Sequence, residues 1–126
     1  MPTTYILLVV LTALIIYMGI NYFRQRKASK MIGETEFREG FRKGQLIDLR
    51  DADDFKSGHI LGARNIPLSQ LKLYINGLRQ DKPVYLYCQS TARSQRASIL
   101  LHKAGFQEIY QLTGGFRKWT GKIKKT

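Results

Sequence analysis

Hydrophobic and polar positions divide the chain into a uniformly apolar N-terminal segment and a longer part in which short apolar runs alternate with polar ones. No side chain in residues 3–22 is charged, and Ile, Leu, Val, Tyr and Ala dominate there. About 20 apolar residues are needed for a helix to cross roughly 30 Å of hydrocarbon. A buried helix of a soluble domain would be shorter and amphipathic. The pattern therefore predicts one transmembrane helix.

The flanks of this segment distinguish an anchor from a cleaved signal peptide. A signal peptide would have a basic region before the apolar run and a small-x-small site after it, and neither is present. Basic residues instead follow the run at once: Arg24, Arg26, Lys27 and Lys30. Because basic flanks remain in the cytoplasm, we expect a single-pass protein of the cell membrane with its N-terminus outside. Residues 1–30 would form this anchor and residues 31–126 a cytoplasmic domain, with residues 28–33 as a short tether.

The remaining pattern predicts strands that alternate with helices. Short apolar runs typical of strands buried on both faces lie at residues 45–49, 84–87 and 108–112. Apolar positions at helical spacing, with capping residues and terminal glycines, lie at residues 35–44, 51–58, 69–78 and 94–104, and a last helix is expected around Trp119. Such alternation indicates an α/β domain with a largely parallel sheet.

Charge and cysteine content restrict the chemistry. The formal net charge is +12, of which residues 31–126 carry +8. A basic domain beside a membrane is attracted to anionic headgroups, whereas basic residues as scattered as these do not indicate nucleic-acid binding. The single cysteine, Cys88, excludes an internal disulfide and fits a reducing cytosol. With two histidines and no cysteine pair, neither a metal site nor a cofactor is expected.

Cys88 follows the most clearly predicted strand and precedes a predicted helix, where ligands bind in open α/β sheets. The loop of residues 88–93, Cys-Gln-Ser-Thr-Ala-Arg, is short and polar. Several of its N–H groups and the helix N-terminus could face one sulfur, and Arg93 would add positive charge. We therefore expect the thiol to ionise readily and act as a nucleophile. A small, inert, buried cysteine is the alternative, and position alone leaves both open.

Two stretches carry a family resemblance. Residues 46–68, LIDLRDADDFKSGHILGARNIPL, resemble the first signature of rhodanese-like domains, and residues 84–119 resemble the second, with a strand, Cys-x4-Arg-Ser, a helix and Gly-Gly-Phe-x-x-Trp. The resemblance implies an α/β fold with a central, mostly parallel sheet flanked by helices. It also implies a sulfurtransferase in which Cys88 takes sulfane sulfur from a small anionic donor, thiosulfate or a persulfide. The Cys88 persulfide would pass that sulfur to a thiol acceptor, such as a sulfur-relay protein.

Loop length in this family bears on specificity. Four residues separate Cys88 from Arg93, which resembles the sulfurtransferase loop sized for one sulfur atom. Five would resemble the phosphatase and arsenate reductase loops, which are wide enough for a tetrahedral oxyanion. Thiosulfate-using members often have basic residues directly after the cysteine, so thiosulfate is expected to be a poor donor here. The residues expected to bind the substrate sulfur are Gln89, Ser90, Thr91, Ala92 and Arg93.

Further polar residues are expected to support this loop. The resemblance suggests that Asp48 and Arg50 brace the site through ion pairs, the alternative being a surface pair worth under about 1 kcal/mol. His59 is expected to be architectural and not a general base, although histidine titrates near neutrality. Arg96 could face the loop or solvent. A non-catalytic rhodanese-like module for interaction or persulfide sensing at the membrane remains the alternative function.

Overall fold

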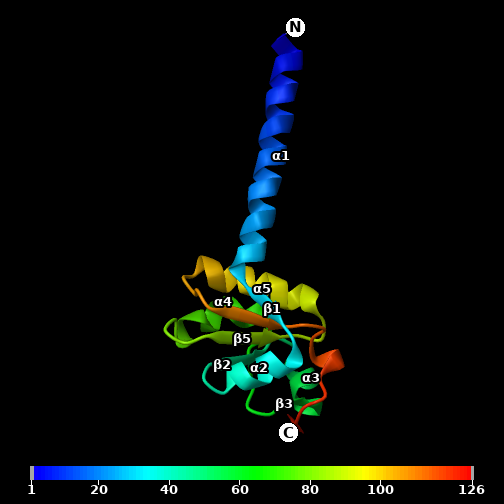
Figure 1. Cartoon of the computed structure of the whole chain (residues 1–126), viewed down its shortest axis with the longest axis vertical. Coiled ribbons are helices and arrows are strands. Elements are labelled where there is room, and N and C mark those ends of the chain that lie inside the picture. Colours follow the sequence, from blue (N-terminus) through cyan, green and yellow to red (C-terminus); the bar gives the residue numbers. More distant parts are fainter. Residues whose placement is uncertain (1, 126) are drawn as a thin grey trace.

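A single long helix projects from a small α/β domain (Figure 1). The structure is a computed structural model that describes residues 2–125, and for residues 24–28 it describes the backbone alone. Helix α1 (Pro2–Ala28) includes the stretch Pro2–Phe23, which has a mean hydropathy of 2.3, and no residue of its most apolar part is buried. It is therefore long and apolar enough to span a membrane. The side chains of Arg24, Arg26 and Lys27 lie outside the described residues.

The domain is built on a five-stranded sheet in the order β1-β6-β5-β2-β4, in which every pairing is parallel. The predicted parallel sheet is thus confirmed. A second, two-stranded sheet pairs β3 with β7 antiparallel. The strands are β1 (Lys30–Ile32), β2 (Gln45–Asp48), β3 (His59–Ile60), β4 (Arg64–Asn65), β5 (Val84–Tyr87), β6 (Ile109–Leu112) and β7 (Ile123–Lys124).

Helices cover both faces of the main sheet. They are α2 (Glu34–Phe41), α3 (Ala52–Ser57), α4 (Leu71–Tyr74) and α5 (Thr91–Lys103), with 3₁₀ turns at η1 (Leu68–Gln70), η2 (Ile75–Gly77) and η3 (Phe116–Lys118). Strand β5 shows why two cores form, because successive strand side chains point to opposite faces. Leu86 packs with residues of α4 and α5, and Tyr85 and Tyr87 pack with Phe37 of α2.

Several predicted elements differ from those observed. The predicted tether contains β1, because Ile32 is buried and three residues pair with β6, a run too short for a pattern to reveal. The helix expected from residue 69 is broken into η1, α4 and η2. The helix expected around Trp119 is only the turn η3, and β7 follows it.

Boundaries and short strands account for the other differences. Helix α2 begins at Glu34 after Gly33, one residue before the expected Thr35, and α5 begins at Thr91, three residues early. Strands β3, β4 and β7 were not predicted, because two residues cannot display an alternation.

Candidate active site around Cys88

Cys88 is placed where two neighbouring parallel strands end. It follows β5 directly, and α5 begins three residues later. The backbone N–H of Leu49, the residue after β2, donates to the carbonyl of Tyr87 at 2.9 Å, so the two strand ends stay side by side. The Cys88 side chain is buried, with 1% of its surface exposed, and packs in the core cluster that includes Leu49 and Leu86. The sulfur thus lies beneath the surface, at the base of the loop.

Burial raises the pKa of the Cys88 thiol above its ordinary value. The backbone N–H of Gln89, the charge of Arg93 and the backbone N–H of Ser90 act in the opposite direction, while the charge of Asp48 adds to the rise. The expectation of a readily ionised thiol is therefore wrong for the resting protein, because loss of hydration outweighs the loop dipoles. The backbone N–H groups of Gln89 and Ser90 and the charge of Arg93 still stabilise a negative charge on the sulfur once the thiol has ionised.

Two glycines in the turn after β6 pack against the backbone of the Cys88 loop. Gly114 and Gly115 both have positive φ, at 81° and 66°, a conformation that glycine adopts readily because it has no Cβ. A Cβ at Gly115 would lie 2.7 Å from the carbonyl oxygen of Cys88 and 2.6 Å from that of Gln89. Only glycine therefore allows this turn to approach the loop backbone so closely.

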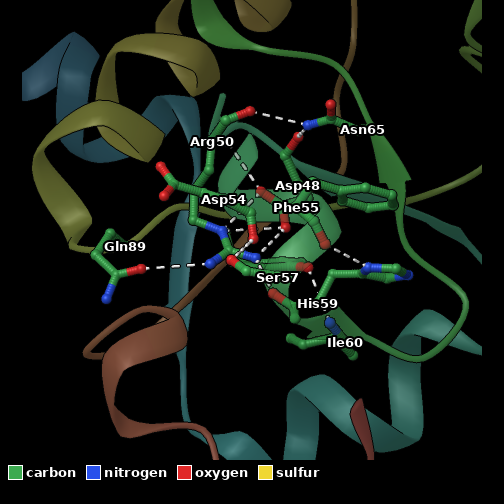
Figure 2. Close-up of polar contacts among 11 residues, drawn as sticks. Asp48, Arg50, Asp54, Phe55, Ser57, His59, Ile60, Asn65 and Gln89 are labelled. Atoms are coloured by element: carbon green, nitrogen blue, oxygen red, sulfur yellow. Dashed lines mark hydrogen bonds and ion pairs between the residues drawn. The ribbon is translucent and has the colours of Figure 1, made fainter. Parts of the chain in front are cut away.

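Asp48 and Arg50 form a buried ion pair beside the loop (Figure 2). Arg50 Nη2 lies 2.8 Å from Asp48 Oδ2, and Arg50 Nε donates to both carboxylate oxygens at 3.1 and 3.2 Å. The same guanidinium donates to the carbonyl of Gly58 at 2.6 Å and to Gln89 Oε1 at 3.4 Å. It also lies 4.1 Å from the ring centroid of Phe116. Arg50 thus connects the end of β2, the end of α3 and the Cys88 loop.

His59 and Asn65 hold the backbone around this pair. The His59 ring stacks on Phe55 at 3.7 Å between centroids, and its Nδ1 lies 2.7 Å from the Phe55 carbonyl oxygen. Asn65 Nδ2 donates to the carbonyl of Arg50 at 2.8 Å and to that of Asp48 at 3.2 Å. Sequence reasoning missed Asn65, because its role depends on β4 lying beside β2, and strand order was not predicted.

The other predicted residues are distributed along the loop and α5. Gln89, Ser90, Ala92 and Arg93 are exposed and Thr91 is half-buried. Arg93 lines a hollow of about 270 Å³ with Leu49, Asp51, Leu68 and Ser69. Arg96 is exposed and does not line this hollow. Among the described residues, no group of three or more His, Cys, Asp or Glu side chains could hold a metal ion.

Comparisons with known proteins agree with this arrangement. The family model described as "Rhodanese-like domain" matches residues 33–122. The chain is similar to YqhL of Bacillus subtilis (strain 168), with 58% identity over 119 residues and 94% of each chain covered. It is also similar to the thiosulfate sulfurtransferase GlpE of Shewanella oneidensis, with 32% identity over 100 residues, 79% of this chain and 95% of that protein.

Among solved structures, a crystal structure of a rhodanese-related protein from Thermoplasma volcanium superposes with a TM-score of 0.71. That match covers 77% of this chain and 99% of the other, at 24% identity. At this level of identity the likeness supports the fold, and the fold places the loop after β5 at the carboxyl edge of the sheet.

Proposed function

The chain belongs to the rhodanese-like domain family, and on that premise we propose that it is a sulfurtransferase whose Cys88 carries sulfur as a persulfide. One arrangement supports the proposal: Cys88 lies between the end of β5 and the N-terminus of α5, where the backbone N–H groups of Gln89 and Ser90 and the charge of Arg93 favour a negative charge on its sulfur. These groups stabilise a negative charge on sulfur. The similarity to GlpE, a thiosulfate sulfurtransferase, supports the same reaction class.

The proposed reaction has two displacements. The Cys88 thiolate attacks the sulfane sulfur of the donor, so that a new S–S bond forms at Cys88 and the donor's own bond to that sulfur breaks. The remainder of the donor leaves with the electron pair, as sulfite in the case of thiosulfate. An acceptor thiolate then attacks the outer sulfur of the Cys88 persulfide and restores the Cys88 thiolate. Neither step needs an oxidant, a reductant or a cofactor.

The loop restricts which sulfur compounds react. The four residues between Cys88 and Arg93 resemble the family's sulfurtransferase loop, which is sized for one sulfur atom, and neither Gln89 nor Ser90 is basic. A dianionic donor such as thiosulfate therefore gains little from the residues next to the sulfur, and we propose a small organic persulfide as the better donor. The 270 Å³ hollow beside Arg93 would hold the organic part of such a molecule.

The burial of Cys88 favours one other candidate, a module that stores or senses a persulfide without passing it on. Cys88 is 1% exposed, so its side chain is sheltered from solvent, and burial raises the pKa of its thiol above the ordinary value. Such a module would take up one sulfur but would not turn over. The two candidates therefore differ in the second displacement alone.

We also propose that α1 anchors the domain in the cell membrane, with the N-terminus outside and the domain in the cytoplasm. The hydropathy of α1 and the basic residues after it support this topology. The match to YqhL leaves at most a few residues of this chain unaligned, so it includes most of α1. A membrane-impermeant maleimide tests the topology in a Cys88→Ser background. Thr3→Cys should react on intact cells, and Lys43→Cys only after permeabilisation; the reverse order would contradict the proposal.

Steady-state kinetics test the enzymatic proposal. Initial rates of sulfur transfer from thiosulfate or a small organic persulfide to a thiol, with both concentrations varied, should follow a ping-pong pattern. Cys88→Ser should abolish transfer, whereas Arg96→Ala, which changes an exposed side chain outside the hollow, should leave the rate unchanged. Undiminished transfer by the Cys88→Ser protein would exclude the proposed carrier.

A further inference from the structure

The point at which α1 leaves the domain is fixed beside α5. Strand β1 is the edge strand next to β6, and Ser29 immediately precedes it. The side-chain amide of Gln111, in β6, donates to Ser29 Oγ and, at 2.8 Å, to Gln95 Oε1 of α5. Helix α1 also contacts α5 directly. In Figure 1, α5 accordingly lies directly beneath the end of α1.

Helix α5 has one face toward the sheet and one toward the outside. Its buried residues are Ser94, Ala97, Ser98 and Leu101, which recur at helical spacing. At 3.6 residues per turn the opposite stripe consists of Ala92, Arg96, Ile99 and Lys103. Arg96 and Lys103 are exposed, and α5 contains no acidic residue. The charged residues of this outer stripe of α5 are therefore all basic.

Acidic residues are distributed unequally across the domain. Seven of the nine acidic residues lie between positions 34 and 54, including three on α2 and two on α3. In Figure 1, α2 and α3 lie on the side of the domain away from α1. The acidic elements thus lie far from the proposed membrane, while α5 and the exposed Lys30 of β1 lie near it.

We propose that the outer stripe of α5, with Lys30, rests on anionic lipid headgroups of the bilayer that α1 spans. The inference depends on the proposed anchor. Each juxtamembrane Lys or Arg near an anionic surface shifts the ratio of docked to undocked domain roughly fivefold in favour of docking. Because α5 begins in the Cys88 loop, docking would hold that loop close to the headgroups. The domain would then exchange sulfur next to the membrane surface.

The test uses the full chain with Cys88→Ser in lipid nanodiscs. A fluorophore is attached at His102→Cys, which is exposed on α5, or at Thr35→Cys, which is exposed on α2. A quencher attached to lipid headgroups reports proximity to the bilayer. With phosphatidylglycerol in the disc, position 102 should be quenched more strongly than position 35. This excess should shrink in discs of phosphatidylcholine alone.

Charge reversal identifies the surface. Arg96→Glu with Lys103→Glu removes two such residues, so the ratio of docked to undocked domain, reported by the fluorophore at position 102, should fall by about 25-fold or more. Lys43→Glu with Lys56→Glu makes the same change in net charge on exposed residues near the acidic elements and should leave the ratio unchanged. If the ratio of docked to undocked domain fell equally in both variants, or if quenching did not depend on lipid charge, the inference would be overturned. The anchor would not be, provided that the chain is inserted in the disc. A chain that fails to enter the disc at all would overturn the anchor and the inference together.

Discussion

The backbone N–H of Phe116 donates to the carbonyl of Cys88 across 2.8 Å. A peptide group is planar, and its C=O and N–H point in opposite directions. By holding the Cys88 carbonyl, Phe116 therefore also fixes the N–H of Gln89 on the other side of that peptide, and this N–H lowers the pKa of the Cys88 thiol. The turn after β6 thus positions one of the groups that stabilise an anionic sulfur.

Gly115→Ala should distort this arrangement. The new Cβ would approach the carbonyl oxygens of Cys88 and Gln89 to within 2.7 Å at a φ of 66°, so the turn must move. We expect a loss of about 1–3 kcal/mol in unfolding free energy, measured by urea denaturation, together with slower sulfur loading of Cys88. Gly77→Ala is the matched control, because a Cβ there meets nothing within 4 Å. Equal effects of the two substitutions would contradict this role of Gly115.

Arg50→Met should destabilise the domain strongly. It leaves the buried carboxylate of Asp48 without the guanidinium that neutralises it, at a cost of about 3–5 kcal/mol in unfolding free energy. Arg79→Ala breaks a pair of similar geometry, with Asp81, that is exposed to solvent. That control should leave the denaturation midpoint nearly unchanged. A small effect of Arg50→Met would show that the buried pair is dispensable.

Arg93→Ala should slow the first displacement more than Arg96→Ala. The charge of Arg93 opposes the rise in the pKa of Cys88, and its loss removes that stabilisation of the thiolate. We expect the rate of sulfur loading from a small persulfide to fall by roughly tenfold. Loss of a buried hydrogen-bond donor that stabilises an oxyanion would cost more, but Arg93 is exposed to solvent. Mass spectrometry of samples quenched at successive times measures this rate. Matching rates for the two alanine variants would exclude a special role for Arg93.

Alkylation of Cys88 should report the raised pKa. Only the thiolate reacts with iodoacetamide, so the rate for the native chain should continue to rise at pH values where the urea-unfolded chain has levelled off. The unfolding free energy also depends on this group, because the folded state favours the neutral thiol. The contribution of Cys88 to stability is present below the pKa of the unfolded thiol and is lost as pH rises above it. A native profile that levels off at lower pH than the unfolded one would contradict the assignment.

The parallel sheet and the position of Cys88 could be predicted because their sequences carry strong local patterns. Residues 84–87 form a continuous apolar, β-branched and aromatic run, and they are the strand β5 in full. The positive φ of Gly114 and Gly115 was also predictable from residue type. By contrast, β1 and β7 are too short to show a pattern in the sequence, and they are recognised as strands only because they pair with β6 and β3.

The electrostatics of the site were harder to predict. Loop composition indicated N–H groups and Arg93 near the sulfur, and the groups of Gln89, Ser90 and Arg93 do lower the pKa of Cys88, although burial raises it more. The depth of Cys88 depends on Leu49 and Leu86 packing against it, which requires the tertiary arrangement of β2 and β5. For the same reason, sequence could not reveal that Asp48 and Arg50 form a buried pair or that Asn65 holds their backbone.

The most direct test of the sulfur-carrier account is the mass of the intact chain during a single turnover. Incubated with a small organic persulfide and freed of excess donor, the protein should gain the mass of one sulfur atom, located on Cys88 by peptide mapping. Addition of a thiol should then return the mass to its starting value and produce the acceptor persulfide in equal amount. A chain that gains no sulfur, or that gains it with Cys88 replaced by serine, would contradict the account.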